Sequence, residues 1–87
     1  MSQSDKVDKL IVSARGPFKV YYEGDAEAVT ATNQVGQFDI LPGHADFFSL
    51  LKPGDVVIET SNNPVSFSIS NGIITVRDNE VLLFVNI

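Results

Sequence analysis

The chain has 87 residues and a mass of 9.5 kDa, which leaves room for one domain. It has no cysteine, which excludes a disulfide framework, a thiolate metal site and a cysteine nucleophile, and one histidine is too few for most zinc sites. Eleven acidic against six basic residues give a net charge of −5, the wrong sign for nucleic acid or an anionic membrane surface. Without a long apolar run or a signal peptide, we expect a soluble cytoplasmic protein with no direct membrane insertion.

The residue composition favours strands. Valine (11) and isoleucine (7) outnumber leucine (6) and alanine (5), and β-branched side chains fit a pleated sheet better than a helix. Turn signals such as Gly16-Pro17, Pro42-Gly43 and Pro53-Gly54 recur every eight to twelve residues. The sequence therefore predicts an all-β fold, a small antiparallel β-sandwich of about eight to ten short strands in two sheets.

In chain order, residues 1–8 are polar and are predicted to fray, and the sandwich domain is expected over 9–87. Phe18, Val20 and Tyr22 alternate with polar neighbours, which predicts a strand with one apolar face. The adjacent tyrosines, 21 and 22, are expected to be one core and one surface residue. Residues 46–51 are the only segment that could form a helical turn.

Two hairpins are predicted in the carboxy-terminal third. Residues 65–70 alternate apolar residues and serines, and Asn71-Gly72 then suits the positive φ angles of a type I′ turn. Asp78-Asn79 gives a weaker hairpin signal. Residues 81–85 follow it and are apolar enough to be buried on both faces.

No chemical site emerges from the residues themselves. His44, Asp46 and Ser49 have the types of a catalytic triad, but the spacing is weak support and no oxyanion donors are identifiable. Asp39, Asp46 and Asp55 are too dispersed for a calcium loop. We therefore expect no catalytic residue, no metal site and no cofactor.

Phe47-Phe48 is the strongest hint of a binding site. The two phenylalanines are adjacent and cannot both point inward from an extended segment, so one is expected either to be exposed close to the Pro42-Gly43 turn, as a binding residue, or to cap the core of the sandwich.

A resemblance to a known family is carried by Gly36-Gln37-Phe38-Asp39-Ile40-Leu41-Pro42-Gly43-His44-Ala45, followed by Leu50-Leu51-Lys52-Pro53-Gly54. This stretch resembles the signature segment of the ATP synthase epsilon subunit. Ser70-Asn71-Gly72 and the strand after it resemble that family's Ser-Gly-Gly hairpin. The resemblance covers roughly residues 9 to 87.

The resemblance implies a β-sandwich that binds the gamma subunit in the central stalk and touches the loops of the c-ring. It implies a non-catalytic rotor part, linking gamma to the c-ring for proton-driven ATP synthesis, on the cytoplasmic side of the energy-transducing membrane. The predicted contact residues fall in two sets, and the isolated chain is expected to be monomeric. The gamma-contact candidates are Pro42, Gly43, His44, Ala45, Phe47 and Phe48, and the c-ring candidates are Asn33, Gln34, Val35, Gly36 and Gln37.

The sequence also departs from the family pattern. Gln37 is neutral where the family often has an acid that can pair with a basic c-ring loop, and Phe47-Phe48 replaces a common Pro-Leu. Epsilon subunits usually continue into two regulatory helices, and the predicted strands reach Ile87, so we expect the sandwich without that hairpin. The alternative is a free-standing β-sandwich module for interaction or ligand binding, since a fold does not fix a function.

Overall fold

The computed structural model describes residues 9–87, so the predicted fraying of residues 1–8 lies outside the described residues. Within that range the chain forms nine strands, and no helix there could span a membrane. This confirms the all-β class. The strands are β1 (Leu10–Arg15), β2 (Val20–Ala26), β3 (Ala28–Thr32), β4 (Gln37–Ile40), β5 (Phe47–Leu51), β6 (Gly54–Glu59), β7 (Val65–Ile69), β8 (Gly72–Arg77) and β9 (Glu80–Val85).

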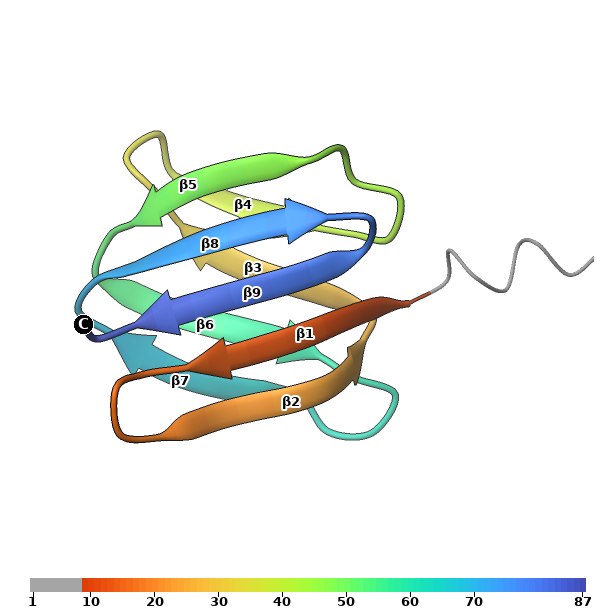
Figure 1. Ribbon diagram of the computed structural model, residues 1–87, viewed down its shortest axis with the longest axis horizontal. Helices are drawn as coiled ribbons and strands as arrows, with labels where there is room; N and C mark the ends of the chain where they lie inside the picture. The colour runs from red at the N-terminus through yellow and green to blue at the C-terminus, as the bar shows by residue number, and fades with distance from the viewer. Residues whose placement is uncertain (1–8) are drawn as a thin grey trace, which may run out of the picture.

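The strands form two packed sheets (Figure 1). One sheet has five strands in the order β2-β1-β9-β8-β5, and the other has four in the order β4-β3-β6-β7. Neighbouring strands are antiparallel except β1 and β9, which are parallel. The predicted sandwich is thus confirmed, with one parallel pair that joins the first strand to the last.

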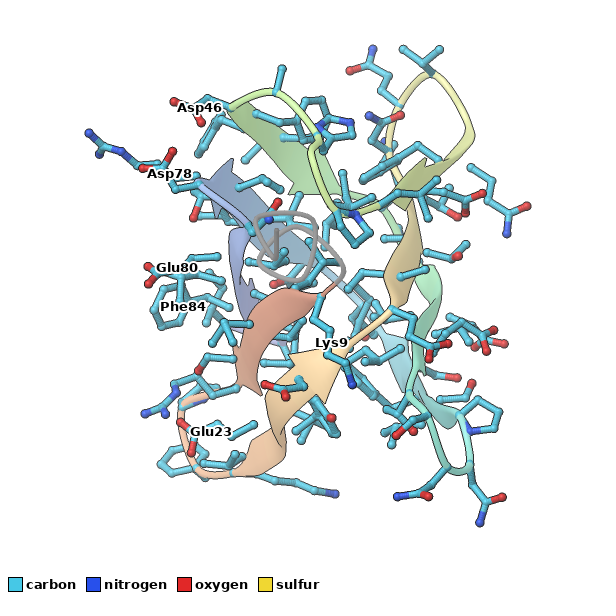
Figure 2. All side chains as sticks on the ribbon, turned by 90° about the vertical axis from the view of Figure 1, so that its right-hand side faces the viewer. Lys9, Glu23, Asp46, Asp78, Glu80 and Phe84 are labelled. Atoms are coloured by element: carbon cyan, nitrogen blue, oxygen red, sulfur yellow. The ribbon has the colours of Figure 1, made fainter. Side chains whose placement is uncertain are left out.

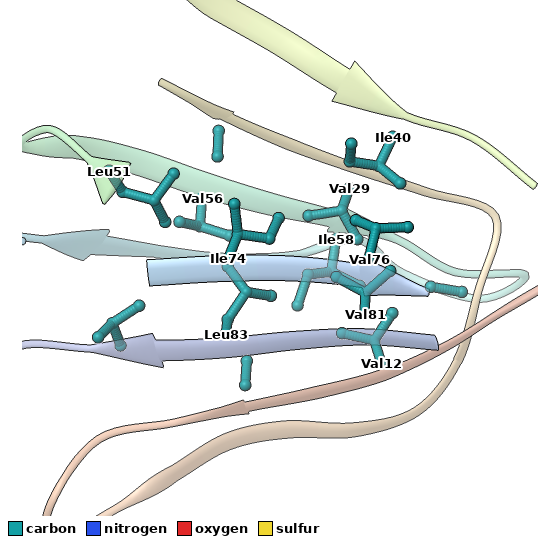
Figure 3. Close-up of a cluster of buried hydrophobic side chains, with 14 of the residues drawn as sticks. Val12, Val29, Ile40, Leu51, Val56, Ile58, Ile74, Val76, Val81 and Leu83 are labelled. Atoms are coloured by element: carbon teal, nitrogen blue, oxygen red, sulfur yellow. The ribbon is translucent and has the colours of Figure 1, made fainter. Parts of the chain in front are cut away.

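The core lies between the sheets and consists of alternate residues from both. Sixteen apolar residues are buried there, and Ile58, Ile74 and Leu83 are among the largest of them (Figure 3). Aromatic pairs lie where the edge strands of the two sheets approach each other. Tyr21 of β2 stacks on Phe67 of β7 with ring centroids 4.5 Å apart. At the opposite pair of edge strands, the ring centroids of Phe38 in β4 and Phe47 in β5 are 5.4 Å apart.

The Asn71-Gly72 hairpin prediction is wrong, because β7 and β8 belong to different sheets. Gly72 does not have a positive φ. It is a glycine for a steric reason, since a Cβ there would lie 2.9 Å from the Phe84 carbonyl oxygen. The weaker signal is the true hairpin: Asp78 and Asn79 have φ angles of 52° and 64° between β8 and β9, which pair antiparallel.

Three predictions of side-chain orientation are also wrong. Residues 81–85 are not buried on both faces, because Leu82 and Phe84 point out of the sandwich. Phe18 and Val20 are exposed, since the β1–β2 register shifts beside Tyr21 and this bulge breaks the alternation. As a result both adjacent tyrosines are half-buried against the core.

Residues 46–51 form no helical turn. Phe47–Leu51 is β5, an edge strand paired with β8. The alternation of inward and outward side chains along β5 separates the two adjacent phenylalanines. Phe47 packs inward and Phe48 is 63% exposed, as the sequence predicted for one of the two.

A candidate docking surface

The outer surface of the five-stranded sheet is apolar over three adjacent strands. Two cross-strand rows of side chains cover β5, β8 and β9. One row is Leu50, Ile73 and Phe84, and the other is Phe48, Thr75 and Leu82. We call these six residues the apolar face. All four of its residues on β5 and β9 are exposed, so the face has no cover within residues 9–87.

The outer surface of the four-stranded sheet is polar by contrast. Its outward residues are mainly serine, threonine and carboxylates, and they bond to one another across strands. Thr30 Oγ1 donates to Asp39 Oδ1, and Ser68 Oγ donates to Asp55 Oδ1, both at 2.7 Å. The sandwich therefore has one side suited to water and one side suited to a partner, since contiguous apolar patches mark interaction sites.

Acidic residues border the apolar face. Figure 2 shows Asp46, Asp78 and Glu80 along the same side of the molecule as Phe84. A hollow of about 550 Å³ lies at this border, lined by Asp46, Phe47, Phe48, Thr75, Val76, Arg77, Glu80 and Leu82. On the opposite border of the apolar face, Ser13 of β1 lies beside Leu82 of β9, and Arg15 of β1 forms an ion pair with Glu23 of β2.

The turn Pro42–Ala45 lies just before Asp46, the first residue that lines this hollow, and hydrogen bonds hold it in place. Gly43 has a φ of 85° and its N–H donates to Asn79 Oδ1 at 2.8 Å, which ties the turn to the β8–β9 hairpin. His44 Nδ1 lies 2.7 Å from the Ala45 carbonyl oxygen. A carbonyl oxygen can only accept, so this nitrogen carries the proton. The His44 and Phe47 rings meet edge to face, with their centroids 5.5 Å apart.

The loop 33–36 lies at the other end of β4 (Figure 1). Hydrogen bonds within the loop and to β5 hold it in place. Asn33 Oδ1 accepts from the N–H groups of Val35 and Gly36 at 2.9 and 3.2 Å. Its Nδ2 donates to Ser49 Oγ on β5 at 3.1 Å. Gly36 has a φ of 140°, and Val35 stands almost fully exposed at the tip. The turn Pro42–Ala45 and the loop 33–36 therefore lie apart, separated by the length of β4, on the order of 10–15 Å. Phe48 of the predicted gamma-contact set, however, lines a groove together with Asn33, Gln34 and Val35 of the predicted c-ring set.

The alternative chemical sites do not assemble. Ser49 Oγ is bonded to Asn33 and to the Leu50 carbonyl, and no hydrogen bond joins it to His44. Asp39 and Asp55 bond to different hydroxyl groups. Among residues 9–87, no group of three or more His, Cys, Asp or Glu side chains could hold a metal ion.

Sequence reasoning found Phe48 but missed the other members of the apolar face. Leu82 and Phe84 lie in a run that is apolar at every position, which is typical of a strand buried on both sides. The signal that could have found them is Arg77 and Glu80, charged residues in outward positions of β8 and β9. Their places show that one side of this sheet has no second layer.

A β-sandwich with one apolar and one polar outer surface is typical of a domain that docks through one of its sides. The chain belongs to the family of the ATP synthase delta/epsilon chain, and residues 9–87 match the model of its beta-sandwich domain.

Similar proteins include two ATP synthase epsilon chains. That of Geobacter sulfurreducens is 33% identical over 78 residues, which are 90% of this chain and 56% of the relative. That of Xanthomonas oryzae pv. oryzae is 40% identical over 77 residues, which are 87% of this chain and 53% of the relative. The chain thus spans about half the length of the curated relatives it matches.

Two solved structures share the fold. The mitochondrial ATP synthase of Euglena gracilis, a complex of OSCP, F1 and c-ring, matches with a TM-score of 0.82 at 21% identity, over 90% of this chain and 51% of that chain. The central stalk and c-ring of the Tetrahymena thermophila enzyme match with a TM-score of 0.76 at 24% identity, over 92% and 65%.

Proposed function

We propose that this chain is an epsilon-type, non-catalytic part of a rotary ATP synthase rotor that links the gamma subunit to the c-ring during proton-driven ATP synthesis. The family match supports this role, as do relatives named ATP synthase epsilon chain. In this role the chain is peripheral to the energy-transducing membrane, on its cytoplasmic side.

The apolar face carries the proposal. The outward row of Leu50, Ile73 and Phe84 crosses three neighbouring strands, and its two outer members are exposed. Removing this apolar area from water is favourable by roughly 25 cal/mol per Å² before the costs of association. The gamma subunit is the occupant we assign to it, together with the neighbouring turn Pro42–Ala45. Acidic residues at the border favour basic residues in the facing surface of gamma.

Phe48 is the residue whose loss tests the gamma contact. Phe48→Ser should weaken binding to purified gamma about 30-fold, because buried aromatic anchors commonly contribute 2 kcal/mol or more. His44→Ala should weaken binding by about 3- to 10-fold, since one net hydrogen bond contributes about 0.5–1.5 kcal/mol. Surface plasmon resonance measures both, and circular dichroism checks that the variants fold.

Phe18→Ser is the matched control. Phe18 is also an exposed phenylalanine, at 99%, but it lies in the β1–β2 turn and is not one of the six residues of the apolar face. Its replacement should leave gamma binding unchanged. If Phe48→Ser and Phe18→Ser have equal effects, the apolar face is not the gamma-binding surface.

The c-ring contact is assigned to residues 33–37. The rigid loop presents Val35 as an apolar tip, and Gln37 at its end is uncharged, so we expect an apolar and hydrogen-bonded contact instead of an ion pair. Val35→Asp should reduce co-sedimentation with c-ring proteoliposomes at least fivefold when gamma is present. Unchanged co-sedimentation would contradict the assignment of this loop.

A further inference from the structure

Strand β5 has an unprotected edge. It is the last strand of its sheet, and its five residues contain neither a charge nor a proline, the usual protections of an edge strand. The other edge of that sheet, β2, carries Glu23, Asp25 and the bulge. Strand β7 is also uncharged, but its outward residues are serines, so pairing there would bury little apolar surface.

The backbone groups on the free edge of β5 can be identified. The Lys52 N–H, one residue past the strand, donates to the Thr32 carbonyl oxygen at 2.9 Å, away from β8. Backbone groups alternate between the two edges of a strand, so Phe48 and Leu50 present theirs on the same side as Lys52. Within residues 9–87 these groups have one partner, the Ser49 hydroxyl, which donates to the Leu50 carbonyl oxygen. A neighbouring strand could form about four hydrogen bonds with these two residues.

A groove lies along this edge. It has a volume of about 360 Å³, and the loop 33–36 forms its opposite wall. The bond from Asn33 Nδ2 to Ser49 Oγ sets the distance between loop and strand. We call it the edge groove, and its lining residues are Asn33, Gln34, Val35, Phe48, Ser49 and Leu50. Three of the six are exposed apolar side chains, so the groove suits apolar side chains of an extended segment.

Opposite charges flank the strand. Asp46 precedes β5 and Lys52 follows it. We propose that the edge groove binds one extended segment of a partner protein as an added antiparallel strand. The segment has apolar residues at alternate positions, an acidic residue at its amino end facing Lys52 and a basic residue at its carboxyl end facing Asp46. The edge groove shares Phe48 and Leu50 with the apolar face and residues 33–35 with the proposed c-ring contact, and the test below uses neither gamma nor the c-ring, so its outcome is separate from theirs.

The test uses the full chain, labelled with ¹⁵N, and the peptide acetyl-Glu-Val-Thr-Val-Thr-Val-Lys-amide. The peptide should bind saturably at about millimolar concentration and slow amide exchange at Phe48 and Leu50 about tenfold or more. A peptide with its two end charges exchanged should bind at least threefold more weakly. Unchanged exchange at these two amides, or equal binding of the two peptides, would overturn the proposal.

Variants separate the edge from the apolar face. Leu50→Pro removes an outward N–H and should weaken peptide binding at least tenfold. Val35→Glu changes only the exposed loop tip, cannot disturb the core, and should weaken binding at least fivefold. Leu82→Ser removes an apolar side chain of the same face on an inner strand and should leave binding unchanged. If Leu82→Ser weakens binding as much as Val35→Glu, the peptide lies on the face and the inference is wrong.

Discussion

Asn79 joins three parts of the sandwich, and its replacement gives a sharp test of what holds the Pro42–Ala45 turn. It occupies the β8–β9 turn with a φ of 64°, in the left-handed region. Its Oδ1 accepts from Gly43 N–H and its carbonyl oxygen accepts from Ile11 N–H, each at 2.8 Å. Asn79→Gly keeps the backbone angle accessible and removes only the side-chain bond.

Asn79→Ala removes the same bond and places in the left-handed region a residue that tolerates it less well than asparagine does. The bond to Gly43 is exposed, so its loss should cost about 0.5–1 kcal/mol, at the lower end for a hydrogen bond. Alanine bears the full cost of the left-handed region, roughly 1–2 kcal/mol, which the polar side chain reduces for asparagine and which glycine avoids. We therefore expect Asn79→Gly to lower the free energy of unfolding by about 0.5–1 kcal/mol and Asn79→Ala by about 1–3 kcal/mol.

Urea denaturation followed by circular dichroism measures both losses, and a thermal melt should show a shift of about 4–8 °C per kcal/mol for a domain of this size. Asn63→Ala, in an exposed turn, is the control and should stay within about 0.5 kcal/mol. The Gly43 amide should exchange faster in both Asn79 variants, to the same extent. If alanine costs no more than glycine, the argument from backbone strain is refuted.

Three further outcomes follow from the packing. Gly72→Ala should destabilise the fold by about 1–3 kcal/mol in urea melts, because the added Cβ would lie 2.9 Å from the Phe84 carbonyl oxygen and 3.0 Å from the Val85 side chain. An unchanged midpoint of the urea transition would contradict this steric account. Phe67→Ala should lower the free energy of unfolding by about 2–3 kcal/mol, since the ring is half-buried and stacked on Tyr21. Ser66→Ala should change it by no more than about 0.5 kcal/mol, and equal losses would show that the faces of β7 are misassigned. Isothermal calorimetry with millimolar Mg-ATP should give no saturable signal, because the sequence has no phosphate-binding loop, and a saturable signal would contradict this.

The sequence predicted those features that depend on neighbouring residues. Serines at every second position from Ser66 to Ser70 predicted the inward and outward sides of β7, because side chains in a strand alternate. Adjacent phenylalanines predicted that one would be exposed, for the same reason. Recurrent turn residues predicted the strand lengths and hence the sandwich.

The sequence could not predict which sheet a strand joins. Asn71-Gly72 suits a tight hairpin locally, but β7 pairs with β6 before it and β8 pairs with β5 and β9, so the two strands lie in different sheets. The groups around this connection instead bond to Asn86, whose Oδ1 accepts from Ser70 N–H at 2.7 Å and whose N–H donates to the Asn71 carbonyl oxygen at 2.9 Å. The choice between joining the same sheet and crossing to the other sheet leaves no mark in local turn residues.

Only part of the candidate site could be predicted from the sequence. Loop residues such as Val35 and the Pro42-Gly43 turn stand out in the sequence because turns have distinctive composition. The apolar face does not, because Ile73 and Phe84 resemble core residues until the two sheets are in place. An apolar residue that faces a partner and one that faces the core are the same residue type.

The parallel pairing of β1 with β9 has a consequence for synthesis on the ribosome. β9 is the central strand of its sheet, and it is the last strand of the described chain to be made. At about 5–20 residues per second, β1 leaves the peptidyl transferase centre roughly 4–15 s before its neighbour exists. β2 can pair with β1 early, but the sheet cannot close until translation reaches Val85. Nascent chains are therefore exposed to aggregation until β9 has been made, and a premature stop before β9 would remove the middle of the sheet instead of trimming its edge.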